Sequence, residues 1–194
     1  MRFPLFLAGL LFFTSVRAEV PATPADDFNF LETTKPDAAA LAHQAQVERE
    51  IARRRGMLQL HQVLGIATLA SLGTTVILGQ LNYQDRYLGG GDKGTFYKWH
   101  VGFSIGTSAL FATTGLLGLL APVPFEKKLQ LDTATLHRSA MALATLGMAA
   151  ELVLGVTTAR HEGFMSQRDF ALTHQIIGFT AFGAMAAGFS ILFF

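Results

Sequence analysis

Polar and apolar stretches alternate along most of this chain, and four of the apolar runs are long enough to cross a lipid bilayer. The runs cover residues 57–81, 99–123, 136–158 and 170–194, and the first two are separated by a polar, glycine-rich connection, residues 82–98. A spanning helix needs about 20 apolar residues, and short connections force successive spans to run antiparallel. The pattern predicts an all-α integral membrane protein, built as an up-down four-helix bundle.

The chain before the first span has two predicted parts. Residues 1–18 combine a positively charged start, a short apolar region and a small-residue exit, the pattern of a secretory signal peptide. The alternative is an uncleaved signal anchor, and either one places the next residues outside the cytoplasm. Residues 19–56 then form an extramembrane tail, in which strong helix formers from Ala38 to Arg55 predict a helix. That helix is either a binding surface for a partner or an extension of the first membrane helix.

One histidine stands near the first turn of each span: His61, His100, His137 and His174. Because the spans alternate in direction, His61 and His137 belong to one membrane face, and the other two belong to the opposite face. In a bundle arranged in order, alternate helices are diagonal, so each pair can point inward across the bundle. A histidine inside a membrane span is costly and usually marks a functional site.

Two imidazoles on opposite sides of a haem iron leave no open coordination position, which favours electron transfer over oxygen chemistry. The chain contains no cysteine, so disulfides, iron–sulfur clusters and thiolate ligation are excluded. We therefore interpret the four span histidines as iron ligands of two haem b groups, one near each membrane face. The structural alternative is that each histidine only forms a hydrogen bond to a neighbouring helix.

Basic residues are scattered and the net charge is +1, which argues against nucleic-acid binding.

This arrangement resembles the transmembrane core of the cytochrome b561 family, in which four consecutive helices supply one histidine each and alternate helices share a haem. The resemblance covers residues 57–194. It implies that His61 and His137 ligate one haem b, that His100 and His174 ligate the other, and that electrons cross the membrane between them. The chain matches no ascorbate-site motif, so the electron donor and acceptor stay open between a redox partner protein and a quinol or small reductant.

Two further polar residues are candidates for contact with a haem. Glu151 lies 14 residues after His137, which returns it to within about 40° of the same helix face. We expect it to face inward near the haem of His100 and His174, where it tunes the potential or accepts a proton. The alternative is a neutral carboxyl group bonded to a serine or threonine of another helix. Arg138 either pairs with a haem propionate or extends to the membrane interface.

Basic residues near the spans are almost balanced between the two faces, so the expected orientation follows the signal peptide. The protein is expected in an inner (cytoplasmic) membrane, surrounded by lipids, with the tail and C-terminus periplasmic. A homo-oligomer is compatible with this arrangement. His43 and His161 lie outside the spans and are interpreted as surface residues. The main alternative function is a haem-free membrane anchor or scaffold of a larger complex; a haem transport or sensing protein is the third.

Overall fold

The computed structural model describes residues 37–91, 93–124 and 130–192 of the chain. Within them the helices follow one another as α1 (Ala38–Tyr87), α2 (Thr95–Leu120), α3 (Thr133–Arg160) and α4 (Gln167–Ser190). Each is long and apolar enough to cross a membrane, which confirms the all-α, four-helix interpretation. The predicted signal peptide and residues 19–36 of the predicted tail lie outside the described residues.

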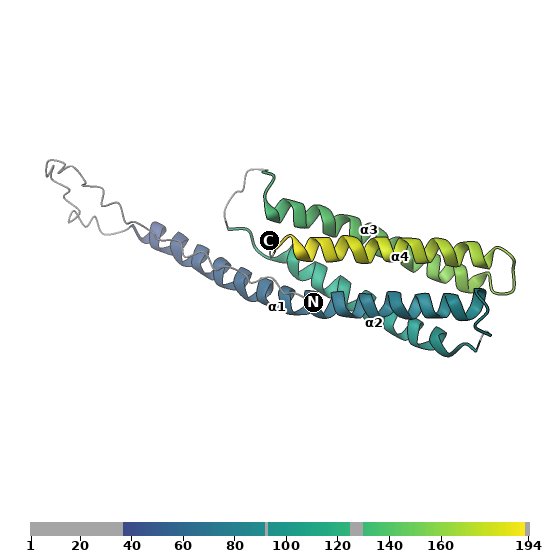
Figure 1. Cartoon of the computed structure of the whole chain (residues 1–194). Coiled ribbons are helices and arrows are strands. Elements are labelled where there is room, and N and C mark those ends of the chain that lie inside the picture. The colour runs from purple at the N-terminus through teal and green to yellow at the C-terminus, as the bar shows by residue number, and fades with distance from the viewer. Residues whose placement is uncertain (1–36, 92, 125–129, 193–194) are drawn as a thin grey trace, which may run out of the picture. The chain divides into compact units, whose positions relative to one another are not determined.

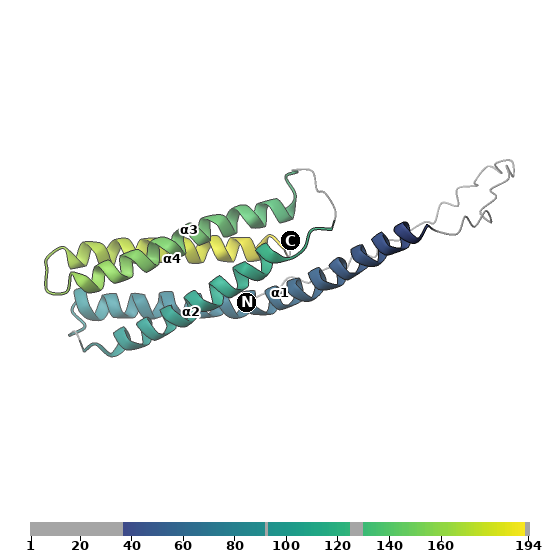
Figure 2. The same cartoon turned by 180° about the vertical axis from the view of Figure 1, so that it is seen from behind.

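The helices alternate in direction, so the bundle consists of two hairpins, α1–α2 and α3–α4. Figure 1 shows the connections within both hairpins at one end of the bundle, which we call the loop end. The ends of α2 and α4 lie at the opposite end, and the view from behind shows the same arrangement (Figure 2). Short polar connections produce this up-down order because an apolar span cannot turn back inside the bilayer.

α1 runs from Ala38 to Tyr87 without a break, so the helix predicted before the membrane and the first span are one element. A single glycine at position 56, between strong helix formers, lowers helix propensity by only about 1 kcal/mol. The guanidinium of Arg54 donates a hydrogen bond of 2.7 Å to the carbonyl of Pro122, which ties α1 to the chain just after α2. Residues 38–56 are therefore an extension of the first membrane helix, and their use as a binding surface stays a prediction.

The connection between α1 and α2 is shorter than the polar stretch 82–98 predicts. α1 continues to Tyr87 and α2 begins at Thr95, so only seven residues, 88–94, connect them. Glycine ends the helix here: Gly89, Gly91 and Gly94 have φ angles of 87°, 92° and 65°. Residues with a Cβ adopt this left-handed region only at a cost, whereas the polar residues before Gly89 have no such barrier to helix formation.

The two hairpins are held together by different side chains. In α3–α4 the backbones approach closely at small residues, and a Cβ on Gly147 would lie only 2.8 Å from the Cβ of Ala181. In α1–α2 the contact is made by buried hydroxyl groups, with the Thr107 oxygen 2.6 Å from that of Ser71 and 2.9 Å from that of Thr75. Close small-residue contacts and interhelical hydrogen bonds are the two main ways in which membrane helices associate.

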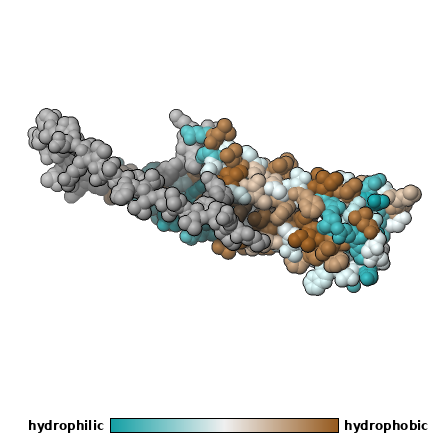
Figure 3. Space-filling model, viewed as in Figure 1, coloured by the Kyte–Doolittle hydropathy of each residue, from teal (hydrophilic) through white to brown (hydrophobic). Residues whose placement is uncertain are grey.

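Large apolar side chains point outward from the helices, the reverse of a water-soluble bundle. Examples from the four helices are Val63, Ile105, Leu146 and Ile176, whose exposed fractions lie between 57% and 70%. Figure 3 shows apolar residues spread over much of the visible helical surface, with polar residues gathered near the loop end. Lipid chains would cover such a surface, and the protein is therefore a multi-pass membrane protein.

Candidate functional site

The four span histidines lie in two pairs, each contributed by alternate helices. The ring centroids of His61 (α1) and His137 (α3) are 6.3 Å apart. Those of His100 (α2) and His174 (α4) are 5.9 Å apart. These are the same two pairs that the alternating direction of the spans predicts. The structure thus brings together, at two places, imidazoles that are more than seventy residues apart in the chain.

The two pairs lie toward opposite ends of the bundle. His61 packs against Gly118, near the end of α2, and His137 contacts Gly188, near the end of α4. His100 and His174 instead are the sixth residue of α2 and the eighth residue of α4, closer to the loop end. One pair is therefore near each end of the membrane-spanning part.

Three of the four rings are held by a main-chain carbonyl of the neighbouring helix in the same hairpin. The Nδ1-to-oxygen distances are 2.8 Å for His61 and Thr114, 3.0 Å for His100 and Thr75, and 2.8 Å for His137 and Gly188. A carbonyl can only accept a hydrogen bond, so each contact assigns the proton to Nδ1. The Nε2 lone pair is then left for another partner, as in metal-ligating histidines.

A glycine lies against three of the rings, and at Gly79 a side chain would displace the imidazole. A Cβ would lie 3.2 Å from the His61 ring at Gly118, 2.9 Å from the His100 ring at Gly79, and 3.4 Å from the His174 ring at Gly155. The residue four positions before each glycine supplies the group that faces Nδ1: Thr114, Thr75 and Glu151. A glycine one turn away therefore lets the ring reach that group.

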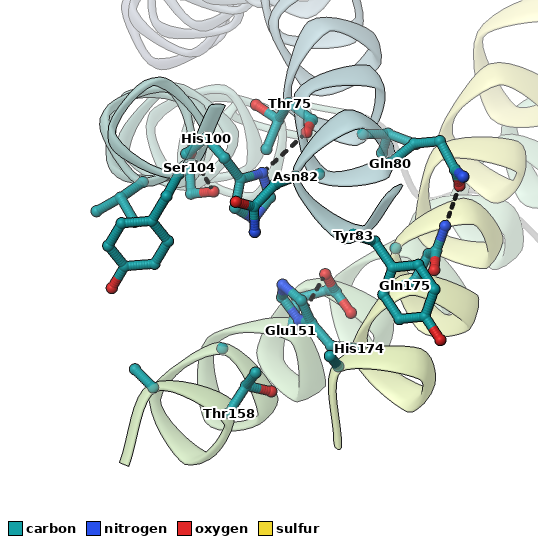
Figure 4. A pocket seen from close by; sticks show the side chains of 18 of the residues that line it. Thr75, Gln80, Asn82, Tyr83, His100, Ser104, Glu151, Thr158, His174 and Gln175 are labelled. Atoms are coloured by element: carbon teal, nitrogen blue, oxygen red, sulfur yellow. Dashed lines mark hydrogen bonds and ion pairs between the residues drawn. The ribbon is translucent and has the colours of Figure 1, made fainter. Parts of the chain in front are cut away.

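His174 differs from the other three histidines in what faces its Nδ1. That atom lies 3.1 Å from Oε2 of Glu151 on α3, and Figure 4 shows the two side chains facing each other. Their alignment is not that of a hydrogen bond, and among the described residues neither His174 Nδ1 nor Glu151 Oε1 has another partner. Glu151 faces inward, and its contact is with a candidate haem ligand instead of a serine or threonine hydroxyl.

A cavity of about 400 Å³ surrounds the pair at the loop end. His100, His174 and Glu151 line it, together with apolar residues and several polar side chains (Figure 4). Two of these, Gln80 of α1 and Gln175 of α4, are hydrogen-bonded to each other across the bundle. Ligand sites in proteins commonly have volumes of about 300–1,000 Å³, with few polar groups in a mostly apolar wall.

Sequence reasoning did not single out the glutamine pair or Gly79, although glutamines inside apolar spans were a signal. His161, which the sequence predicts to be a surface residue, is instead half-buried where α3 ends, with Nδ1 2.8 Å from the Thr157 carbonyl. Its ring also packs 4.5 Å from that of Phe170. His43 is exposed, as expected, and Arg138 is exposed beside His137.

The spacing of each pair fits an iron held between two imidazoles. A metal–imidazole bond of about 2.0 Å on each side, plus roughly 1 Å from the nitrogen to the ring centre, separates the centroids by about 6 Å. The observed distances are 6.3 and 5.9 Å. Among residues 37–91, 93–124 and 130–192, no three histidine, cysteine, aspartate or glutamate side chains form a metal-binding group. A haem iron needs only two ligands from the protein.

Comparison with protein-family models, with characterised proteins and with solved structures gives no match to this chain.

Proposed function

We propose that this protein is a transmembrane cytochrome that holds two b-type haems and passes electrons between the two membrane faces, similar to the core of the cytochrome b561 family. The observation that carries the proposal is the two imidazole pairs, with centroids 6.3 and 5.9 Å apart, toward opposite ends of a membrane bundle. His61 and His137 would hold one haem, and His100 and His174 the other. Each haem would supply a one-electron ferric–ferrous couple.

The chain itself contributes the position and the environment of the ligands. Carbonyl contacts at Nδ1 orient three of the rings, and such partners also raise the basicity of the ligating nitrogen. With both imidazoles of a pair as its ligands, a haem iron would have no open position for oxygen or water, which favours electron transfer. The surrounding apolar side chains limit access of solvent and so influence the potential.

The proposed setting is an inner (cytoplasmic) membrane, with the tail and C-terminus on the periplasmic side. The signal-peptide pattern of residues 1–18 supports this orientation. An electron donor and acceptor must then reach opposite faces of the bundle. We propose a redox partner protein for one of them and either a second protein or a quinol or small reductant for the other.

The first test is an absorption spectrum of the detergent-purified protein, dithionite-reduced minus oxidised, with haem quantified as the pyridine haemochrome. We expect the sharp bands of low-spin haem b and about two haems per chain, one for each histidine pair. A protein made with ample haem supply that shows no such bands would overturn the proposal. The haem-free scaffold would then be the better interpretation of the same bundle.

Ligand substitutions test the pairing. His61→Ala and His137→Ala should each remove the same haem, because either change deprives one iron of an axial ligand. His100→Ala and His174→Ala should each remove the other haem, and His43→Ala, at an exposed position, should remove neither. Potentiometric titration of the remaining haem identifies which one is lost. Loss of different haems on substituting His61 and His137 would refute the assignment.

A further inference from the structure

The four span histidines differ in the group that faces Nδ1, and His174 is the exception. His61, His100 and His137 each face a main-chain carbonyl at Nδ1. His174 faces the carboxyl group of Glu151, which is four residues before Gly155, as Thr114 and Thr75 are four residues before Gly118 and Gly79. Glu151 is also the only aspartate or glutamate that the sequence contains within residues 57–81, 99–123, 136–158 and 170–194. The two haem sites therefore differ in charge although their histidine pairs are similarly spaced.

A carboxylate acts on a ligating histidine differently from a carbonyl. A carbonyl is a neutral acceptor, whereas a carboxylate brings a full negative charge to within 3.1 Å of Nδ1. That charge stabilises the ferric state of the iron, which has one more positive charge than the ferrous state. Hydrogen bonds and net charge near a haem or cluster are known determinants of its reduction potential.

Burial makes the effect of this carboxyl group strong. The side chain of Glu151 is 18% exposed and that of His174 is 21% exposed. A charge in such surroundings is screened much less than one in water. Gly178 of α4 keeps the carboxyl group close to α4, because a Cβ there would lie 3.1 Å from Glu151 Oε2.

We propose that Glu151 is a positioning residue for His174, and that it lowers the reduction potential of the haem held by His100 and His174 relative to the haem held by His61 and His137. This inference rests on the proposed function. It gives the pair of haems a direction: electrons pass from the haem at the loop end to the haem at the opposite end.

The test is a potentiometric titration of Glu151→Gln, a substitution that keeps the shape of the side chain and removes its charge. The His61→Ala background isolates the haem of His100 and His174. At a fixed solution potential, we expect the ratio of reduced to oxidised haem to rise at least tenfold. This corresponds to a rise of about 59 mV in the reduction potential for one electron. In the His100→Ala background, which leaves only the other haem, the same substitution should change the ratio by less than about twofold.

The matched control is Glu162→Gln, the same substitution after the end of α3, where the side chain is 67% exposed and paired with Arg86. Solvent screens that charge, so the ratio should change by less than about twofold. An unchanged potential in Glu151→Gln, or equal shifts of both haems, would overturn the inference while leaving the cytochrome intact. A parent protein without haem would instead remove the proposed function.

If the Glu151→Gln protein loses the haem held by His100 and His174, the potential of that haem cannot be measured, and a second variant is needed. Glu151→Asp keeps the charge beside His174, so it should retain this haem with a potential closer to that of the parent. If the Gln variant alone loses the haem, the carboxylate is needed to position His174. If both variants lose it, Glu151 acts only through packing and the inference fails.

Discussion

At the scale of single residues, each site depends on an imidazole that reaches a neighbouring helix through the space beside a glycine. Gly118, Gly79 and Gly155 lie against His61, His100 and His174, respectively. Without a Cβ, these positions let the ring approach the backbone of the preceding turn. The orientation of the candidate ligands is therefore set as much by what the glycines lack as by hydrogen bonds.

Gly79→Ala tests this dependence at the loop end. The new Cβ would lie 2.9 Å from the His100 ring, too close for the ring to keep its position. We expect haem affinity of this site to fall about 10–100-fold, as for other losses of ligand support, and the haem held by His61 and His137 to stay. Haem content and difference spectra of the purified variant measure both.

Gly102→Ala is the matched control, because nothing lies within 4 Å of a Cβ at that position on α2. It should bind as much haem as the parent protein. If Gly79→Ala also keeps both haems with parental spectra, the glycine does not position His100.

At the scale of the helices, the α1–α2 hairpin is the one in which buried hydroxyls from both helices meet. Thr107 on α2 contacts Ser71 and Thr75 on α1. Farther along the same two helices, the hydroxyl oxygens of Thr114 and Thr68 lie 3.0 Å apart. Thr75 and Thr114 also offer the carbonyls that face His100 and His61. The same turns therefore join the two helices and hold one candidate ligand from each histidine pair.

Thr107→Val removes the hydroxyl at the centre of this contact and nearly keeps the side-chain shape. Because Thr107 is fully buried and loses two interhelical hydrogen bonds, we expect the free energy of unfolding to fall by about 0.6–1.7 kcal/mol. Unfolding in mixed micelles of a mild detergent and sodium dodecyl sulfate, followed by circular dichroism, measures it.

Thr113→Val provides the comparison on the same helix. Thr113 is exposed, and its hydroxyl bonds the Ala109 carbonyl of its own helix. It should cost clearly less stability than Thr107→Val. Equal losses in the two variants would mean that the interhelical hydroxyl contacts contribute little.

At the scale of the whole molecule, four spans return the chain to the face from which it entered. α1 and α3 therefore run in one direction across the membrane, and α2 and α4 in the other. The loop end carries the ends of α1 and α3 and the starts of α2 and α4, whereas α2 ends and α3 begins at the opposite end. With a periplasmic tail, the loop end and the His100–His174 pair face the cytoplasm.

Reporter fusions in a bacterial host test this orientation. Alkaline phosphatase fused after Phe194 should be active, because the C-terminus is expected in the periplasm. A fluorescent protein that does not fold after export should show no fluorescence at the same place. Fusions within residues 88–94 should give the reverse pattern. Phosphatase activity only in the loop fusion would show the opposite orientation, and activity at both places would contradict the four-span topology.

The sequence by itself determined the number of spans, their alternation and the histidine pairs. These properties depend on local patterns: apolar length selects a spanning helix, and short polar connections reverse its direction. With four alternating helices and one histidine near the start of each, His61 and His137 must approach the same face. The helical period also placed Glu151 inward, from its position relative to His137.

Only the tertiary structure decided which groups meet across the helices. The helical period cannot tell whether Glu151 meets a hydroxyl or His174, because that depends on how α4 is rotated and shifted along its axis. The same holds for Gly79 beneath His100, and for Gln80 bonded to Gln175. Rotation and axial shift follow from close packing of side chains on two helices at once, which no pattern within a single span contains.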